Sequence, residues 1–490
     1  MASALPVWEV SLYFIVWIGH SVFAVYESIR VSAVYGRYAA YDPDYFEPGW
    51  AVLGDTMKDA SNDEWRIWVQ QLKLKLPLCL VHAAVFNVLA VKLNDKWSRL
   101  LTICTWFLLH LSLYSVRLLL STYLQALFLL TVSRSLKNKR QAKCCVWALV
   151  VARVVQLMNK DTATSSFTDW KETVFVGYKL LQFTSFIMDR LDDEGSAESW
   201  YADAFQLSYY SLYWPASTSM HIPYHRFKED IGKRTERKTN WTAVVLFGVR
   251  VVFWTVLADL VQHFVYVNVM MLDADFLSKL GSRTSVAAIG YVSGQLFHLI
   301  YVCTFGALWL CTNLDGIAGY RPPVCISRVC LYSKMWRYFD RGLHDFLRFY
   351  IFLPLSRCGS RIIAYIAVFA FVWIWHGGSL SCAYWAVLNL AEILLENVGR
   401  HVWLATGLGQ CLGPAMTQRL TAVCHVPCAC IGVLSVFFFL GSSDAQTGLV
   451  FARIFVRDTL LSYPLYSVHL LFLFYCFCQC CLQIETVLDY

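Results

Sequence analysis

This chain of 490 residues contains few charged residues. Asp, Glu, Lys and Arg make up 15% of it, hydrophobic residues make up 58%, and the mean hydropathy is +0.49. Soluble domains carry about 25% charged residues, so the deficit excludes an ordinary water-soluble enzyme. The chain has instead many apolar runs, several of them near the length of about 20 residues that crosses a bilayer as a helix. We therefore predict an all-α, polytopic membrane protein.

Other absences narrow the class further. The first eight residues contain no Lys or Arg, so the apolar run 10–26 is interpreted as an uncleaved first membrane helix and not as a signal peptide. The 18 cysteines include no two C-x-x-C pairs at zinc-finger spacing, although Cys424, His425, Cys428 and Cys430 are ligand types close together. No basic and aromatic stripe accompanies the positive charges, which argues against nucleic acid as a partner.

The apolar runs predict about ten to twelve membrane-embedded segments, some of them re-entrant, in one domain covering residues 1–490. Two basic clusters, 134–143 and 226–238, lie between the runs and are placed in the cytosol by the positive-inside rule. Such clusters suit contact with membrane lipid or with substrate phosphates. The candidate segments are 10–26, 76–93, 100–116, 118–132, 144–158, 174–188, 243–271, 286–310, 362–375, 382–395, 420–440 and 460–482.

A histidine stands in a stretch that lacks charged residues. Residues 362–380 contain no Asp, Glu, Lys or Arg and one histidine, His376, which Gly377 and Gly378 follow. A polar group in hydrocarbon costs several kcal/mol unless a partner or water meets it. Because neutral imidazole is a good base near neutral pH, His376 is a candidate general base. The alternative is a histidine bonded to a neighbouring helix without a chemical role.

The second candidate region is the charged and aromatic segment 335–347, MWRYFDRGLHDFL. Its apolar side chains recur at helical spacing. Asp340 in this segment is a candidate for orienting the imidazole or for placing a nucleophile. The alternative is an ion pair of Asp340 with Arg337, Arg341 or His344 on a solvated face.

Two further positions leave alternatives open. Cys325 is a free thiol beside the membrane, for which three roles are open. It is inert, it is acylated, or it is a ligand of a soft metal such as haem iron. Asp259 and His263 share the run 243–271 and are four residues apart, so one helical face can pair them. We favour a structural pair over a polar lining for a tunnel.

The segments 335–347 and 371–378, FVWIWHGG, resemble the motifs of the membrane-bound O-acyltransferase (MBOAT) superfamily and, within it, of the hedgehog acyltransferase family. The likeness runs from about residue 8 to about residue 482. It departs from the family at Ser219 and Met220, where a Gly-Pro step is usual, and at Val436, where an asparagine is expected. Supporting matches are 58–65 (KDASNDEW), 314–316 (LDG) and 388–397 (LNLAEILLEN).

The resemblance implies a tunnel through a multi-helix core in the membrane of the endoplasmic reticulum, with the Golgi as a second location. It implies transfer of palmitate from palmitoyl-CoA to the N-terminal cysteine of secreted Hedgehog-type proteins, with EGF-like ligands as further acceptors. The family's signature histidine and acid map onto His376 and Asp340. Its acyl-pocket tryptophan maps onto Trp336, with Arg337 beside it, and its haem-ligating cysteine onto Cys325.

Two other functions are kept as alternatives. A lipid O-acyltransferase of the same superfamily would use the same histidine on a glycerol or sterol hydroxyl. A non-catalytic transporter or scaffold would use Asp259 and His263 as a proton relay. The segment 336–340 favours a peptide acceptor over both.

Overall fold

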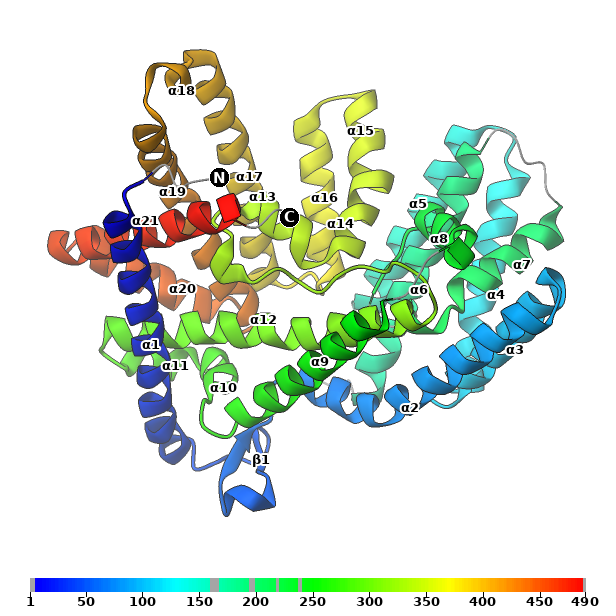
Figure 1. The fold of residues 1–490 in the computed structure, drawn as a ribbon, viewed down its shortest axis with the longest axis horizontal. Coiled ribbons are helices and arrows are strands. Elements are labelled where there is room, and N and C mark those ends of the chain that lie inside the picture. The colour runs from blue at the N-terminus through cyan, green and yellow to red at the C-terminus, as the bar shows by residue number, and fades with distance from the viewer. Residues whose placement is uncertain (1–4, 159–166, 194–198, 217–219, 237–239, 488–490) are drawn as a thin grey trace.

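The computed structural model describes residues 5–158, 167–193, 199–216, 220–236 and 240–487 (Figure 1). Within these ranges the regular secondary structure is helical apart from a two-stranded antiparallel hairpin, β1 (Phe46–Pro48) with β2 (Met57–Asp59). The predicted all-α class is confirmed.

The helices fall into three consecutive groups. The first is α1 (Val7–Tyr38), α2 (Asp63–Lys92), α3 (Asp95–Leu111), α4 (Val116–Ser135), α5 (Lys139–Met158), α6 (Phe167–Asp192), α7 (Trp200–Ser211) and α8 (Tyr224–Gly232). The second is α9 (Trp241–Val261), α10 (Val267–Leu272), α11 (Ala274–Lys279) and α12 (Arg283–Leu314). The third is α13 (Tyr332–Phe339), α14 (Arg341–Leu347), α15 (Leu353–Cys358), α16 (Arg361–Trp375), α17 (Leu380–Thr406), α18 (Leu408–Cys411), α19 (Pro414–Leu440), α20 (Gln446–Ala452) and α21 (Pro464–Val487).

Eight of the described helices are long and apolar enough to cross a membrane: α1, α2, α4, α5, α9, α12, α19 and α21. Helix α16 is apolar but shorter. The multi-pass prediction is confirmed. The predicted segments 174–188 and 382–395 are also helical, within α6 and α17, but these helices carry more polar side chains.

The predicted single segment 243–271 is wrong in one respect, because it is two helices. Helix α9 ends at Val261 and α10 begins at Val267. Between them, the backbone N–H of Tyr266 donates to Ser32 Oγ of α1 at 2.9 Å. The helix is interrupted where a side chain from a distant part of the sequence, Ser32, accepts a backbone hydrogen bond.

Asp259 and His263 do not pair through their side chains. Asp259 accepts hydrogen bonds from the indole N–H groups of Trp50 (2.8 Å) and Trp65 (3.1 Å), and it lies 2.7 Å from Lys58 Nζ. His263 Nε2 accepts from the backbone N–H of Trp50 at 3.0 Å. Both residues therefore anchor the hairpin and the start of α2 to α9, a structural role with partners other than the predicted one.

Helix α12 crosses the middle of the molecule and separates its parts (Figure 1). Helices α13 to α19 stand above it in this view, α3 to α8 lie to the right, and the hairpin hangs below. The matched Asp315 at the end of α12 is fully buried, and it accepts hydrogen bonds from His82 Nε2 and the Tyr213 hydroxyl, both at 2.7 Å. Trp106 donates in turn to His82 Nδ1 at 2.8 Å. This network joins α2, α3 and α12, so the 314–316 motif is structural.

Candidate active site

His376 occupies the turn between α16 and α17. Its backbone N–H donates to the carbonyl of Val372 at 3.0 Å, which closes the last turn of α16. Gly377 and Gly378 then adopt φ values of 93° and 66°, a left-handed region that side chains other than glycine rarely tolerate. Ser379 caps α17 through its side chain. The sequence W-H-G-G-S therefore ends one helix and starts the next with the imidazole at the corner.

The imidazole of His376 is half-buried between two aromatic rings. The rings of Trp385 and Phe439 meet it edge to face, with centroids 5.3 Å and 5.2 Å away. In the part of the chain that the structure describes, neither ring nitrogen has a hydrogen-bond partner. The alternative of a histidine bonded to a neighbouring helix therefore has no support, and the nitrogens are free for a substrate.

Asp340 stands at the junction of α13 and α14. Its Oδ1 accepts from the backbone N–H of Leu343 at 2.9 Å, so it is the N-cap of α14. No ion pair of Asp340 occurs among the described residues; His344, one expected partner, lies instead 3.3 Å from Asp345. Burial raises the pKa of the Asp340 carboxyl to about 6. The carboxyl is thus poised to change charge near neutral pH.

Aromatic side chains connect the Asp340 segment to His376. Trp336 lies 5.4 Å from Trp385, the ring that also touches His376. On the other side, Phe339 stacks on Phe297 of α12 at 5.7 Å, and Phe297 contacts Phe439 at 5.6 Å. The structure therefore brings the predicted Trp336, Asp340 and His376 to one aromatic-walled region, formed by α12, α13, α16, α17 and α19.

Three residues of this region were not predicted from the sequence. The Tyr301 hydroxyl of α12 donates to Glu64 of α2 at 2.9 Å, and Tyr178 of α6 packs edge-on against Trp375 at 5.7 Å. The ring of Tyr301 also lies 5.3 Å from the ring of Phe339. Glu64 could have been predicted, because it lies in segment 58–65, which resembles the family. Tyr178 and Tyr301 could not, because nothing in the sequence distinguishes them from the other tyrosines of aromatic-rich helices.

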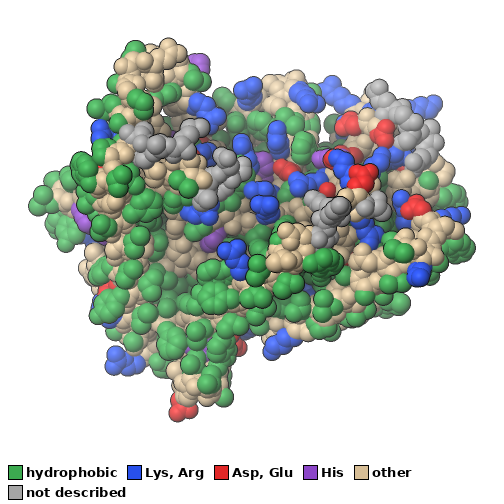
Figure 2. All heavy atoms as spheres, in the orientation of Figure 1, with side chains coloured by type: hydrophobic (Ala, Val, Ile, Leu, Met, Phe, Trp, Pro, Cys, Tyr) green, Lys and Arg blue, Asp and Glu red, His purple; other side chains and the backbone are tan. Residues whose placement is uncertain are grey.

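In the described part of the chain, the rings that contact the imidazole belong to Trp385 and Phe439, and neither Arg337 nor Cys325 forms a hydrogen bond with it. Arg337 is exposed, and Lys and Arg side chains gather in the upper and central part of the face in view (Figure 2). Cys325 precedes a short helix, Ile326–Arg328, and its half-buried thiol makes no hydrogen bond within the described ranges. A free thiol suits haem iron, but haem also requires a flat apolar cleft. Neither described cavity is lined by Cys325, so its surroundings do not by themselves define a haem site.

The cysteines of α19 do not form the metal site kept open above. His425 Nδ1 lies 3.4 Å from Cys330 Sγ, a residue outside the predicted set. Among the residues that the structure describes, no group of three or more His, Cys, Asp or Glu could hold a metal ion. Of the two departures from the family pattern, Ser219 lies outside the described residues and Val436 lies in α19.

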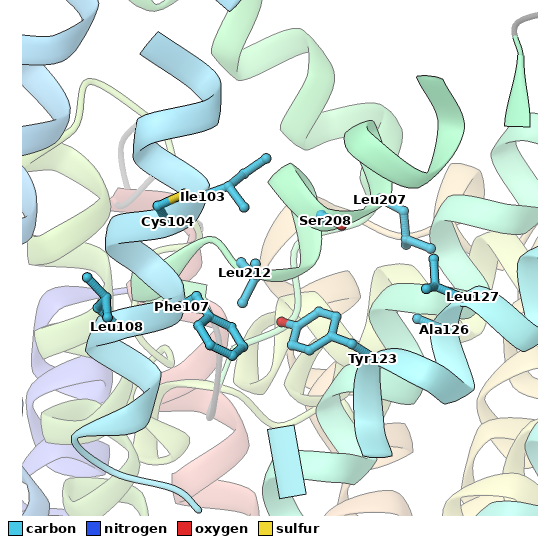
Figure 3. A pocket seen from close by; sticks show the side chains of 10 residues that line it. All are labelled: Ile103, Cys104, Phe107, Leu108, Tyr123, Ala126, Leu127, Leu207, Ser208 and Leu212. Atoms are coloured by element: carbon cyan, nitrogen blue, oxygen red, sulfur yellow. The ribbon is translucent and has the colours of Figure 1, made fainter. Parts of the chain in front are cut away.

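A cavity of about 480 Å³ lies between α3, α4 and α7, away from these residues (Figure 3). Its walls include Phe107, Leu127 and Leu212, and the Tyr123 hydroxyl points into it. None of the predicted site residues lines it. Its walls are apolar, and the residues that line it include no His, Asp, Glu or Lys.

A helical membrane protein whose aromatic-walled region holds an unpaired histidine and a half-buried acid has the parts of an intramembrane acyltransferase. The chain belongs to the membrane-bound O-acyltransferase family, MBOAT, whose sequence model matches residues 70–406. It is 26% identical to the protein-cysteine N-palmitoyltransferase Rasp of Drosophila melanogaster, over 98% of this chain and 95% of the relative. It is 24% identical to the protein-cysteine N-palmitoyltransferase HHAT of Mus musculus, over 96% and 97%. The membrane-bound O-acyltransferase GUP1 of Saccharomyces cerevisiae is 23% identical over 38% of each chain.

Proposed function

We propose that this protein is a protein-cysteine N-palmitoyltransferase. It transfers palmitate from palmitoyl-CoA to the N-terminal cysteine of secreted signalling proteins, Hedgehog-type proteins first and EGF-like ligands second. The observation that carries the proposal is the half-buried, unpaired His376 imidazole between Trp385 and Phe439, in a chain with full-length similarity to two enzymes named for this activity.

The acyl donor is bound mainly by its hydrocarbon chain. Each buried CH₂ contributes roughly 0.8 kcal/mol, so aromatic walls such as Trp336 and Trp385 hold a sixteen-carbon chain readily. The exposed Arg337 meets the phosphates of CoA on the cytosolic side. The acceptor enters from the lumenal side, and a shared tunnel places both substrates together, which lowers the entropic barrier.

His376 acts as the general base. Its free ring nitrogen takes a proton from the acceptor's amine or thiol as that group attacks the thioester carbonyl. The C–S bond of palmitoyl-CoA then breaks, and the CoA thiolate leaves. Asp340, ionised above about pH 6, attracts the positive charge of the acceptor's N-terminus and so places it.

The product is an amide that two routes reach. The amine attacks directly, or the cysteine thiol is acylated first and the acyl group then moves from sulfur to nitrogen. A peptide that begins with serine distinguishes them. Full activity on that peptide excludes an obligatory thioester.

Purified protein with labelled palmitoyl-CoA and a Cys-initiated Hedgehog-type peptide tests the proposal. We expect label on the peptide, and none on the same peptide with an acetylated N-terminus. Label on added glycerolipid or sterol would indicate the lipid O-acyltransferase instead. Label on neither acceptor would leave the transporter or scaffold.

We also propose an endoplasmic reticulum location and a bound haem ligated by Cys325. Haem would supply a redox-active iron, and no step above depends on it. Purified protein should show a Soret absorption band that is lost in Cys325→Ala. A wild-type protein without that band, after expression with added haem precursor, would exclude the haem.

A further inference from the structure

One face of α17 is polar although it is buried. Asn389, Glu392 and Glu396 follow Trp385 at steps of four, three and four residues, so all four share that face. Their exposed fractions are 5% for Trp385, 0% for Asn389, 1% for Glu392 and 9% for Glu396. The mechanism above uses Trp385 alone. Two buried carboxyl groups on one helix face need a physical reason.

The polar end of this face meets the first turn of α13. Helix α13 has no capping side chain of its own at its N-terminus. Glu396 Oε1 accepts a hydrogen bond from the backbone N–H of Ser333, in that first turn, at 3.2 Å. A carboxyl group there satisfies a donor that the helix leaves open and suits the positive end of the helix dipole.

Helix α13 contacts α17 at two points. Ser333 in its first turn meets Glu396, and Trp336, one turn later, meets Trp385. The distance along α17 between these two contacts is about 16 Å, at 1.5 Å per residue. Helix α13 is therefore held at one end by a polar contact and in its middle by an aromatic one, and Asp340 follows at its far end.

Neighbouring groups fit this close approach. A Cβ atom on Gly432 of α19 would lie 3.1 Å from the ring of Tyr332 and 3.2 Å from Glu392 Oε2, so glycine lets α13, α17 and α19 meet. Ser435 Oγ donates to Asn389 at 3.1 Å.

From this geometry we infer that Glu396 is a positioning residue for acyl transfer: by capping α13 from α17, it fixes Trp336 against Trp385 and so shapes the binding site of the acyl donor. The inference rests on the proposed function. It adds a residue more than two turns from the imidazole that acts only through α13.

Kinetics of Glu396 variants test this inference. We expect Glu396→Ala to raise the KM for palmitoyl-CoA about ten-fold, equivalent to ~1.4 kcal/mol, and to change the peptide KM less than about two-fold. Glu396→Gln keeps a carbonyl acceptor for Ser333 and should restore the donor KM to within about three-fold of wild type. Glu396→Leu fills the same space without an acceptor, so it should behave like the alanine variant even if the latter folds poorly.

Lys334→Ala is the matched control. Lys334 is on the same turn of α13, but its side chain is 40% exposed and pairs with Glu485 at 2.7 Å on the surface, where ion pairs contribute little. Equal effects of Lys334→Ala and Glu396→Ala would overturn the inference. So would a glutamine variant as impaired as the alanine variant, or equal rises in both KM values. A wild-type protein that palmitoylates no peptide would instead refute the proposed function.

Discussion

His376 and Asp340 divide the chemistry between them in the proposed reaction. The histidine ring has contacts on its faces and edges but no hydrogen bond to a described residue, whereas the aspartate is fixed by its own helix cap. The His376 ring is held by packing, and its nitrogens have no hydrogen-bond partner among the described residues. The Asp340 carboxyl is oriented by a backbone N–H. The two should therefore respond differently to substitution and to pH.

His376→Ala should lower kcat by about 10² to 10⁴-fold, the usual contribution of a general base. Binding of palmitoyl-CoA should persist, because the aromatic walls remain. Radiolabel transfer to the peptide and equilibrium binding of a non-hydrolysable palmitoyl-CoA analogue measure the two quantities. His401→Ala, on the exposed part of α17, is the control and should be fully active; unchanged turnover in His376→Ala would exclude the base.

The pKa of Asp340 predicts how the peptide kcat/KM changes at acidic pH. Its pKa is raised to about 6, so the carboxyl loses its charge as the pH falls through that value and no longer attracts the acceptor's N-terminus. Log kcat/KM for the peptide should fall below about pH 6 with a slope near one. Asp340→Asn should have a low kcat/KM throughout and no inflection near pH 6. A wild-type inflection that persists in Asp340→Asn would assign it to another group.

The turn from α16 to α17 places the imidazole, and its glycines can be tested as a unit. Gly377→Ala puts a side chain at φ 93°, which costs on the order of 1–2 kcal/mol, and should displace the ring. We expect a loss of at least ten-fold in kcat together with a lower Tm.

Gly407→Ala is the matched control for that strain. Gly407 ends α17 at φ 62°, and a methyl group added to it, as at Gly377, would meet no neighbouring atom. The substitution should lower Tm by a similar amount and leave kcat within about two-fold. Equal activity of the two variants would mean that the turn does not position the base.

The sequence predicts helices better than it predicts the contacts between them. Apolar runs are a local signal, and runs such as 10–26 and 362–375 are helices in the structure. The break between α9 and α10 was missed, because its reason is Ser32, more than 200 residues away. Asp340 carried a readable cap signal, an aspartate three residues before an apolar helix position, which the ion-pair alternative overlooked.

The same difference between local and distant signals applies to the candidate site. His376, Trp336 and Asp340 are candidates because they belong to motifs that are continuous in the sequence. The contacts Trp336–Trp385, Phe297–Phe439 and Tyr301–Glu64 are between side chains of distant helices. The periodicity of one helix does not predict which ring of another helix its side chains contact. The residues that form the walls of the site could therefore be identified only from the structure.

The orientation of the whole chain in the membrane can be measured. The hairpin hangs at the foot of the view, and α5 and α8, next to the basic clusters, lie in its upper half (Figure 1). We predict that the clusters lie in the cytosol and that the hairpin turn lies on the opposite side of the membrane. An Asn-x-Thr acceptor inserted at residues 52–54 should be glycosylated in microsomes, seen as a mobility shift that an endoglycosidase removes.

The same acceptor inserted at residues 136–138 should remain unmodified. The natural acceptor sequence Asn240-Trp241-Thr242 should also be unmodified, because the Asn240 side chain caps α9 by accepting from the backbone N–H of Ala243 at 3.1 Å. Glycosylation of the basic segment, and not of the hairpin, would reverse the orientation and with it the sides from which donor and acceptor enter.

The buried contact of His82 and Tyr213 with Asp315 has a consequence for biosynthesis. The ribosome synthesises His82 and Tyr213 long before Asp315 emerges. During that interval the phenol and the imidazole, which belongs to a helix apolar enough to cross a membrane, have no acceptor at this site. The nascent protein thus passes through a stage that membrane chaperones or degradation factors can recognise, and any truncation before residue 315 leaves it there.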